Sequence, residues 1–77
     1  MNLDDYIGIK IQFGARVRFL RKESNLSIED LALRADLNPR YLGEVERGLR
    51  NVTLEVINKI ANGLKVTLEE LFKGISL

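Results

Sequence analysis

Apolar residues recur every three or four positions along most of this chain of 77 residues, which is the spacing of amphipathic helices. The first apolar stripe consists of Tyr6, Ile9, Phe13, Val17 and Leu20. This stripe predicts a helix over residues 4–23 that turns these side chains toward a core. Ile7 and Ile11 point elsewhere, so they form a second patch that either covers the same core or contacts a second copy of the chain.

Two short helices are expected next, because their capping residues can be read directly. Ser27 can cap a helix whose third residue, Asp30, is placed to bond back to it, as in a capping box. Asn38 can cap the following helix, and Pro39 stands at the first helical position, where its missing N–H costs nothing. Gly48 ends that helix in a left-handed turn. Two short helices joined by so few residues have the layout of a helix-turn-helix.

The last part of the chain predicts two more helices. Thr53 caps a helix with an apolar face formed by Leu54, Ile57, Ile60, Ala61 and Leu64. Thr67 and Glu70 form a capping box for a final helix that ends at Gly74. No linker or internal repeat divides the chain. The sequence therefore predicts an all-α fold, with five helices packed as one compact domain over residues 1–77.

Composition narrows the possible chemistry. The chain has no cysteine and no histidine, so neither a disulfide nor a zinc site is expected, and no cofactor is implied. No apolar run approaches the length of a membrane span, and Asp4 and Asp5 stand where a signal peptide would be basic. We therefore expect a cytoplasmic protein.

Charge is unevenly distributed although the net charge is only +1. Residues 14–24 hold four basic side chains and one acidic side chain, whereas residues 25–38 are net acidic. A basic segment of this kind fits a surface that contacts phosphates. It fits a solvated helix face equally well, so charge alone does not decide the function.

The third helix combines apolar anchors with an outward polar face. At 100° per residue, Leu42 and Val45 fall on one side, while Arg40, Glu44 and Arg47 lie within about 60° on the other. A helix of under three turns is too short to be stable alone in water. Such a helix, held by the rest of the chain with its arginines outward, is suited to insertion into a partner.

Five pieces of the sequence, in order, resemble the lambda-repressor-like or Xre family of helix-turn-helix proteins. The matching pieces are residues 14–21, 26–32, 41–48, 50–54 and 60–72. The match runs from about residue 14 to residue 72, which leaves 1–13 as an N-terminal extension of the first helix. Within the family, Arg50-Asn51 after the glycine and a tyrosine in the third helix look most like the controller proteins of restriction–modification systems.

The resemblance implies that the third helix lies in the major groove of DNA, with its N-terminal residues facing base edges. The expected readers of bases are Pro39, Arg40, Tyr41, Gly43 and Glu44. The Arg40 guanidinium can bond guanine O6 and N7 together. Glu44 either accepts from a cytosine amino group or holds Arg40 or Arg47 in place. Tyr41 either touches DNA or packs against the end of the second helix.

The resemblance also implies contacts to the DNA backbone and one structural ion pair. The expected backbone contacts are Arg18, Ser27, Ile28, Arg47, Arg50 and Asn51. The family usually has glutamine where this chain has Ile28, so one side-chain anchor is missing there, while the backbone N–H groups and the dipole of the second helix, with Ser27 adjacent, can still serve a phosphate. In relatives, the residues matching Arg21 and Glu46 form a buried ion pair beneath the DNA-facing surface.

The function expected from these residues is sequence-specific binding of double-stranded DNA by a transcriptional regulator, as a homodimer on a palindromic operator. The alternative is an antitoxin that binds a toxin as well as DNA. Catalysis is disfavoured, because the chain lacks histidine, cysteine and a glycine-rich phosphate loop. No small-molecule effector is expected. The dimer contact is expected in the Ile7/Ile11 patch, in the fourth helix, or in the last helix with Phe72, Ile75 and Leu77.

Overall fold

The computed structural model describes residues 3–75, with side chains described from Gly8 onward. Every regular element in this part of the chain is an α-helix, so the predicted all-α fold is confirmed. The five helices are α1 Leu3–Glu23, α2 Ile28–Ala35, α3 Pro39–Glu46, α4 Leu54–Leu64 and α5 Leu68–Leu71. None of the described helices is both long enough and apolar enough to cross a membrane.

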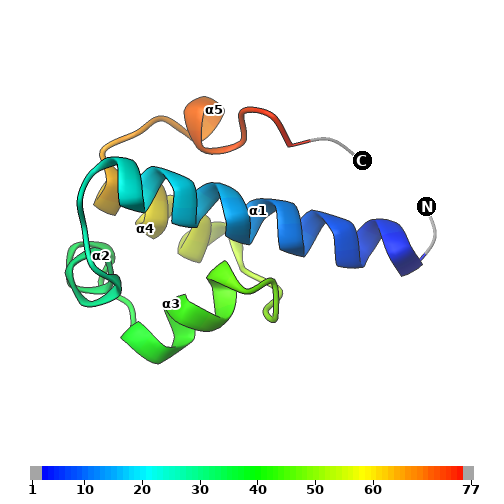
Figure 1. The fold of residues 1–77 in the computed structure, drawn as a ribbon, viewed down its shortest axis with the longest axis horizontal. Helices are drawn as coiled ribbons and strands as arrows, with labels where there is room; N and C mark the ends of the chain where they lie inside the picture. Colours follow the sequence, from blue (N-terminus) through cyan, green and yellow to red (C-terminus); the bar gives the residue numbers. More distant parts are fainter. Residues whose placement is uncertain (1–2, 76–77) are drawn as a thin grey trace.

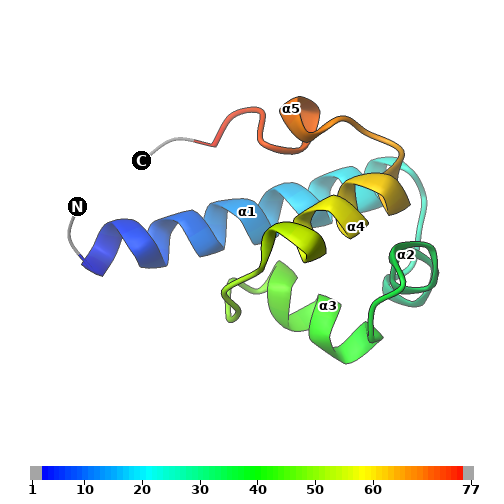
Figure 2. The ribbon, with the colours of Figure 1, turned by 180° about the vertical axis from the view of Figure 1, so that it is seen from behind.

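The helices are arranged around α1, the longest of them. In Figure 1, α1 crosses the view between α5 on one side and α3 on the other. The reverse view in Figure 2 shows α4 alongside α1, with α2 near the C-terminal end of α1. α2 packs against both α3 and α4, while α1 contacts α3, α4 and α5. This arrangement holds α3 at the outer edge of the domain.

Side-chain caps begin four of the helices where the sequence predicts them. Ser27 and Asp30 form the complete capping box of α2, each bonding the other's backbone N–H. Asn38, Thr53 and Thr67 cap α3, α4 and α5 by accepting from backbone N–H groups two or three residues further on. Each cap satisfies donors that a helix N-terminus otherwise leaves without partners.

The core draws side chains from all five helices. Its buried members are Phe13, Val17, Leu20, Leu31, Ala32, Leu42, Val45, Ile60, Ala61, Leu64 and Leu71. The three deepest residues of the predicted α1 stripe are among them, and Ile9 is half-buried. The side chains of Tyr6 and Ile7 and the residue Leu77, which also entered the predictions, lie outside the described part.

Three sequence predictions need correction. Leu54 was expected on the core face of α4, but it is 84% exposed, because the buried residues of α4 all lie in its second half. The last helix is shorter than expected, since α5 ends at Leu71 and a turn runs from there to Gly74. The capping box expected there is half formed: Thr67 accepts from Glu70 N, but the Glu70 carboxylate lies near Arg16 instead.

Candidate nucleic-acid interface

The turn between α2 and α3 is held by local hydrogen bonds. Asp36 adopts a left-handed conformation, with φ of 55°, and Leu37 N donates to Ala32 O over 2.9 Å. The Asn38 side chain then accepts from Arg40 N at 2.8 Å and from Tyr41 N at 3.2 Å. These bonds fix the first turn of α3 and therefore the direction in which its N-terminal side chains leave the backbone.

The inner face of α3 lies directly on α1. Leu42 and Val45 are at most 2% exposed. At Gly14 of α1 the two backbones are so close that an added Cβ would lie 2.3 Å from Val45 O and 2.6 Å from Glu46 O. A glycine is therefore required at this contact, because any side chain would push α3 outward.

An ion pair links the end of α3 to α1 beneath the exposed surface. Arg21 Nε donates to Glu46 Oε2 at 2.7 Å, and Arg21 Nη2 donates to Glu46 Oε1 at 3.0 Å. Arg21 Nη1 also donates to Leu26 O at 2.9 Å. The hydrogen bonds to Glu46 raise the pKa of Arg21, although burial acts in the opposite direction. The structure thus brings together the two residues whose pairing the family resemblance implied.

The outer face of α3 and its C-cap residue carry exposed cations. Arg40 and Arg47 are exposed, and neither forms an ion pair within the described residues. A Cβ on Gly43 would lie 3.4 Å from Arg47 Nη1, so the Arg47 guanidinium lies along the helix beside Gly43. Pro39, at the first position of α3, is exposed beside Arg40. Two free guanidinium groups on a rigid short helix suit recognition of phosphates and guanine edges.

Glu44 has a partner that the sequence did not predict. Glu44 Oε1 accepts from Arg50 Nη2 at 3.3 Å, whereas Arg40 and Arg47 were the protein partners that the sequence suggested as the alternative to a cytosine amino group. The Arg50 guanidinium also lies over the Tyr41 ring, 5.5 Å from its centroid. Tyr41 is half-buried at the edge of the core. We call Tyr41, Glu44 and Arg50 the Arg50 cluster.

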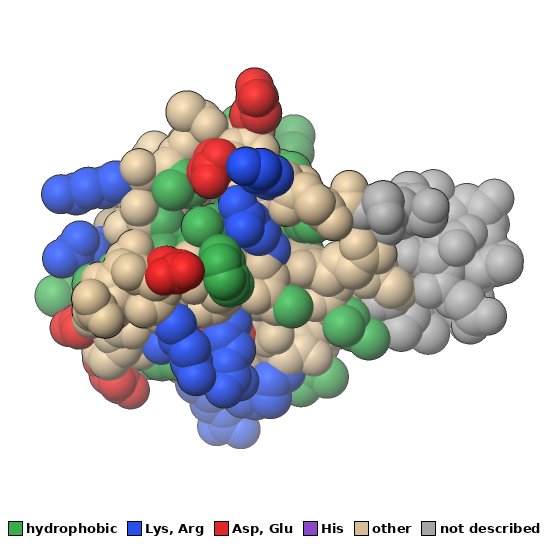
Figure 3. Space-filling model, turned by 45° about the horizontal axis from the view of Figure 1, so that its top comes forward, with side chains coloured by type: hydrophobic (Ala, Val, Ile, Leu, Met, Phe, Trp, Pro, Cys, Tyr) green, Lys and Arg blue, Asp and Glu red, His purple; other side chains and the backbone are tan. Residues whose placement is uncertain are grey.

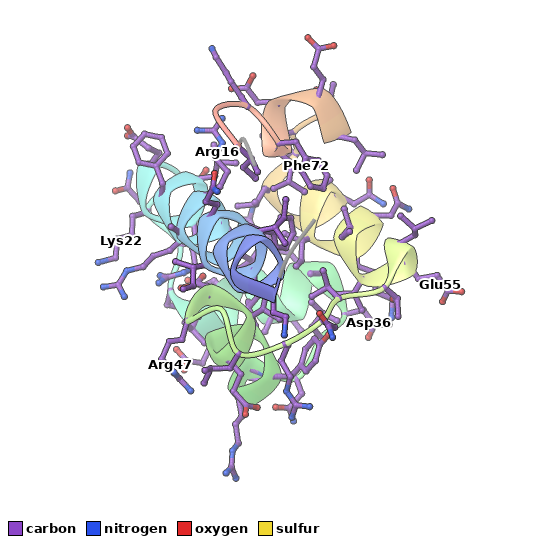
Figure 4. The ribbon with its side chains drawn as sticks, turned by 90° about the vertical axis from the view of Figure 1, so that its right-hand side faces the viewer. Arg16, Lys22, Asp36, Arg47, Glu55 and Phe72 are labelled. Carbon is purple, nitrogen blue, oxygen red and sulfur yellow. The ribbon has the colours of Figure 1, made fainter. Side chains whose placement is uncertain are left out.

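The basic segment of α1 is divided between two faces. Arg16 donates to Glu70 O at 2.8 Å and lies over the Phe19 ring at 5.6 Å, so it fastens α5 to α1. Arg21 is buried against Glu46, which leaves Arg18 and Lys22 exposed. In Figure 4, Lys22 and Arg47 point to the same side of the molecule, while Arg16 lies near α5. In Figure 3, several Lys and Arg side chains, in blue, lie together at the lower edge of the molecule.

The N-terminus of α2 and the loop after α3 hold the other predicted contacts. The Ser27 hydroxyl oxygen is engaged in the cap of α2, and Ile28 is half-buried against the core. Ile28 therefore has a packing role that a glutamine would not have. Asn51 is exposed in the loop, and Val52 packs against the core. The backbone N–H groups at the start of α2, together with the Ser27 hydroxyl hydrogen, are the donors that this end of the domain can offer to a phosphate.

Comparison with known proteins identifies this arrangement of helices. The Helix-turn-helix family matches residues 17–71, which includes α2, the turn and α3. The chain belongs to the Helix-turn-helix family. Relatives similar to it include transcriptional regulators and control proteins, which are not enzymes.

This helix-turn-helix protein is similar over most of its length to two control proteins. It is 47% identical over 68 residues to control protein C.MunI of a Mycoplasma species, with 87% of this chain and 92% of that protein covered. It is 44% identical over 64 residues to C.BamHI of Bacillus amyloliquefaciens, with 82% and 79% covered. The crystal structure of restriction-modification controller protein C.AhdI from Aeromonas hydrophila superposes with a TM-score of 0.79. That pair is 47% identical, and 80% of this chain and 94% of C.AhdI are covered.

Sequence reasoning missed two features of this helix-turn-helix domain. It did not predict that Arg16 would leave the basic surface, or that Arg50 would pair with Glu44. In each case the partner lies on another element, since Arg16 of α1 contacts α5 and Arg50 of the loop contacts α3, so helical spacing does not reveal it. Among the described residues, no group of three or more His, Cys, Asp or Glu side chains is placed to hold a metal ion.

Proposed function

We propose that this protein is a sequence-specific transcriptional regulator that binds double-stranded DNA, with α3 in the major groove, and that it acts as a restriction–modification controller. The observation that carries the proposal is the outer face of α3, where Arg40 and Arg47 are exposed on a helix fixed at both ends. The similarity to C.MunI and C.BamHI supports the controller role. Because its proposed target is DNA, we place its action in the cytoplasm.

The proposed division of labour follows the position of each side chain. Arg40 reads guanine, with Pro39, Tyr41, Gly43 and Glu44 completing the surface that faces the bases. The DNA backbone is held by Arg18, Arg47, Arg50, Asn51, the Ser27 hydroxyl and the backbone N–H of Ile28. Contacts to phosphates give affinity and register, whereas Arg40 gives discrimination between sequences.

We further propose that two copies bind a palindromic operator. One recognition helix reaches only a few base pairs, so a two-fold dimer with half-site centres about 34–36 Å apart would double the contacts. Exposed apolar side chains that a second copy could cover are Leu54 on α4, Leu68 on α5 and Phe72 just after α5. We propose no small-molecule effector, so that protein concentration and operator affinity set the response.

Selection of bound duplexes from a random pool, at two salt concentrations, tests the proposal. We expect a palindromic consensus and an affinity that falls steeply as salt increases. Sedimentation of the purified protein with and without the selected duplex gives the stoichiometry, which should be two chains per duplex. A pool that shows no enrichment at low salt would refute the DNA-binding function. A consensus without two-fold symmetry would refute the palindromic operator alone.

A further inference from the structure

Arg50 differs from the other arginines that we assign to DNA. Within the described residues, Arg18, Arg40 and Arg47 form no ion pair, so their guanidinium groups are available to a ligand. Arg50 is paired with Glu44 at 3.3 Å. A phosphate that approaches the Nη2 side of the Arg50 guanidinium therefore competes with a carboxylate that belongs to the protein.

The Arg50 cluster lies where a DNA phosphate can compete with Glu44 for Arg50. The Arg50 side chain is 50% exposed and the Glu44 side chain 25% exposed, so the pair lies at the surface rather than in the core. Glu44 lies next to Arg40 and Arg47 on the outer face of α3, where the proposed DNA approaches. The Tyr41 ring supports the Arg50 guanidinium from another direction, at 5.5 Å. The pair is thus accessible, weak enough to break, and close to the proposed ligand.

We propose that Glu44 is a specificity-determining residue that acts by competing with DNA phosphates for Arg50. This inference rests on the proposed function. When Arg50 moves to a phosphate, the Glu44 carboxylate loses its cation and faces a polyanion, which is unfavourable. A site that presents an amino group to Glu44, such as that of cytosine, compensates for the loss, whereas an arbitrary sequence does not. Glu44 therefore weakens binding to unrelated DNA more than binding to the operator.

The test measures affinity for a duplex of unrelated sequence and for the selected operator, as a function of salt. Glu44→Gln keeps the shape of the side chain and removes its charge. We expect it to raise affinity for the unrelated duplex roughly fivefold, which is the upper range for loss of an exposed ion pair. For the unrelated duplex, the slope of log affinity against log salt should steepen by about 0.9. The reason is that Arg50 then neutralises one more phosphate, so one more counterion leaves the DNA. The ratio of operator to unrelated affinity should fall.

Glu69→Gln is the matched control. It changes the net charge by the same amount, and Glu69 is exposed on α5, on the other side of α1 from α3. We expect it to change affinity for the unrelated duplex by less than about twofold, because a distant exposed charge is screened. Thermal unfolding of both variants verifies that the fold is intact. Equal effects of Glu44→Gln and Glu69→Gln would overturn the inference, since net charge would then explain both.

A second background separates competition from simple repulsion. In an Arg50→Gln protein there is no cation for Glu44 to hold and only its repulsion of DNA remains, so adding Glu44→Gln should raise affinity for the unrelated duplex by clearly less than it does when Arg50 is present. If Glu44→Gln raises that affinity equally in both backgrounds, the carboxylate acts on DNA directly and the inference is wrong. If the wild-type protein binds neither duplex at low salt, the proposed function itself fails, and this outcome is distinct from the other two.

Discussion

Truncation of Glu46 to alanine would leave the Arg21 guanidinium buried without a carboxylate. The two side chains are 11% and 5% exposed, for Arg21 and Glu46 respectively, and two hydrogen bonds of 2.7 and 3.0 Å join them. In the variant, Arg21 keeps the hydrogen bond from Nη1 to Leu26 O at 2.9 Å. Its Nε and Nη2 lose the acceptor that the Glu46 carboxylate provides in the wild type. The positive charge is then neither paired nor hydrated.

Removal of one partner of a buried pair is expected to cost about 3–5 kcal/mol of unfolding free energy. A loss of 1 kcal/mol lowers the melting temperature of a domain this small by about 4–8 °C, so Glu46→Ala should melt at least about 12 °C below the wild type. Glu44 provides the comparison, because its side chain is 25% exposed and its single hydrogen bond to Arg50 is 3.3 Å long. Glu44→Ala should cost no more than about 1 kcal/mol.

Thermal and urea unfolding, followed by far-ultraviolet circular dichroism, measures both costs. If Glu46→Ala is too unstable to give a native baseline, Glu46→Gln keeps the shape of the side chain and can still accept a hydrogen bond. The double variant Arg21→Met/Glu46→Leu removes both charges together. Since apolar replacement of a whole buried pair is often neutral or stabilising, it should be more stable than Glu46→Ala.

Two results would refute the reasoning. Equal melting shifts for Glu46→Ala and Glu44→Ala would mean that burial of the pair adds nothing. A double variant as unstable as Glu46→Ala would mean that the loss comes from packing volume and not from the unpaired Arg21 charge. Either result would also remove the physical reason for treating this pair as the anchor of the last turn of α3.

Three further outcomes are expected. Gly14→Ala should destabilise the domain by about 3 kcal/mol or more, because its Cβ would meet backbone oxygens of α3, whereas Gly8→Ala, with open space around it, should be neutral or stabilising in the same unfolding assay. The bonds from Ser27 lower the pKa of Asp30, so its carboxylate stabilises α2 above its unfolded pKa near 4. That stabilisation is lost as pH falls through the lowered pKa. Urea titrations should therefore give the wild type a larger unfolding free energy than Asp30→Asn at neutral pH. This difference in unfolding free energy should shrink in acid. Arg40→Ala should relax preference at one position per half-site by about 1–3 kcal/mol in a selection experiment, and a loss spread evenly over all positions would contradict its role as a reader.

The sequence alone determined the features that depend on neighbours within about four residues. The caps at Ser27, Asn38, Thr53 and Thr67 were predictable, because a capping side chain bonds backbone groups two or three positions away. The turn at Gly48, with φ of 76°, was predictable because only glycine adopts that conformation without strain. These local signals delimit α2, α3 and α4 closely, and with them the helix-turn-helix.

The tertiary structure alone decided which predicted faces are covered and which charges are paired. Leu54 has helical spacing with the core residues of α4, yet it is exposed, because spacing gives the direction of a side chain but not whether another helix lies opposite it. Arg16 belongs to the basic segment 14–24 and Arg50 to the loop after α3, and each is held by an acid on another element. Which arginines remain free for DNA therefore depends on how α5 and the loop after α3 fold back, and this depends on contacts between distant residues.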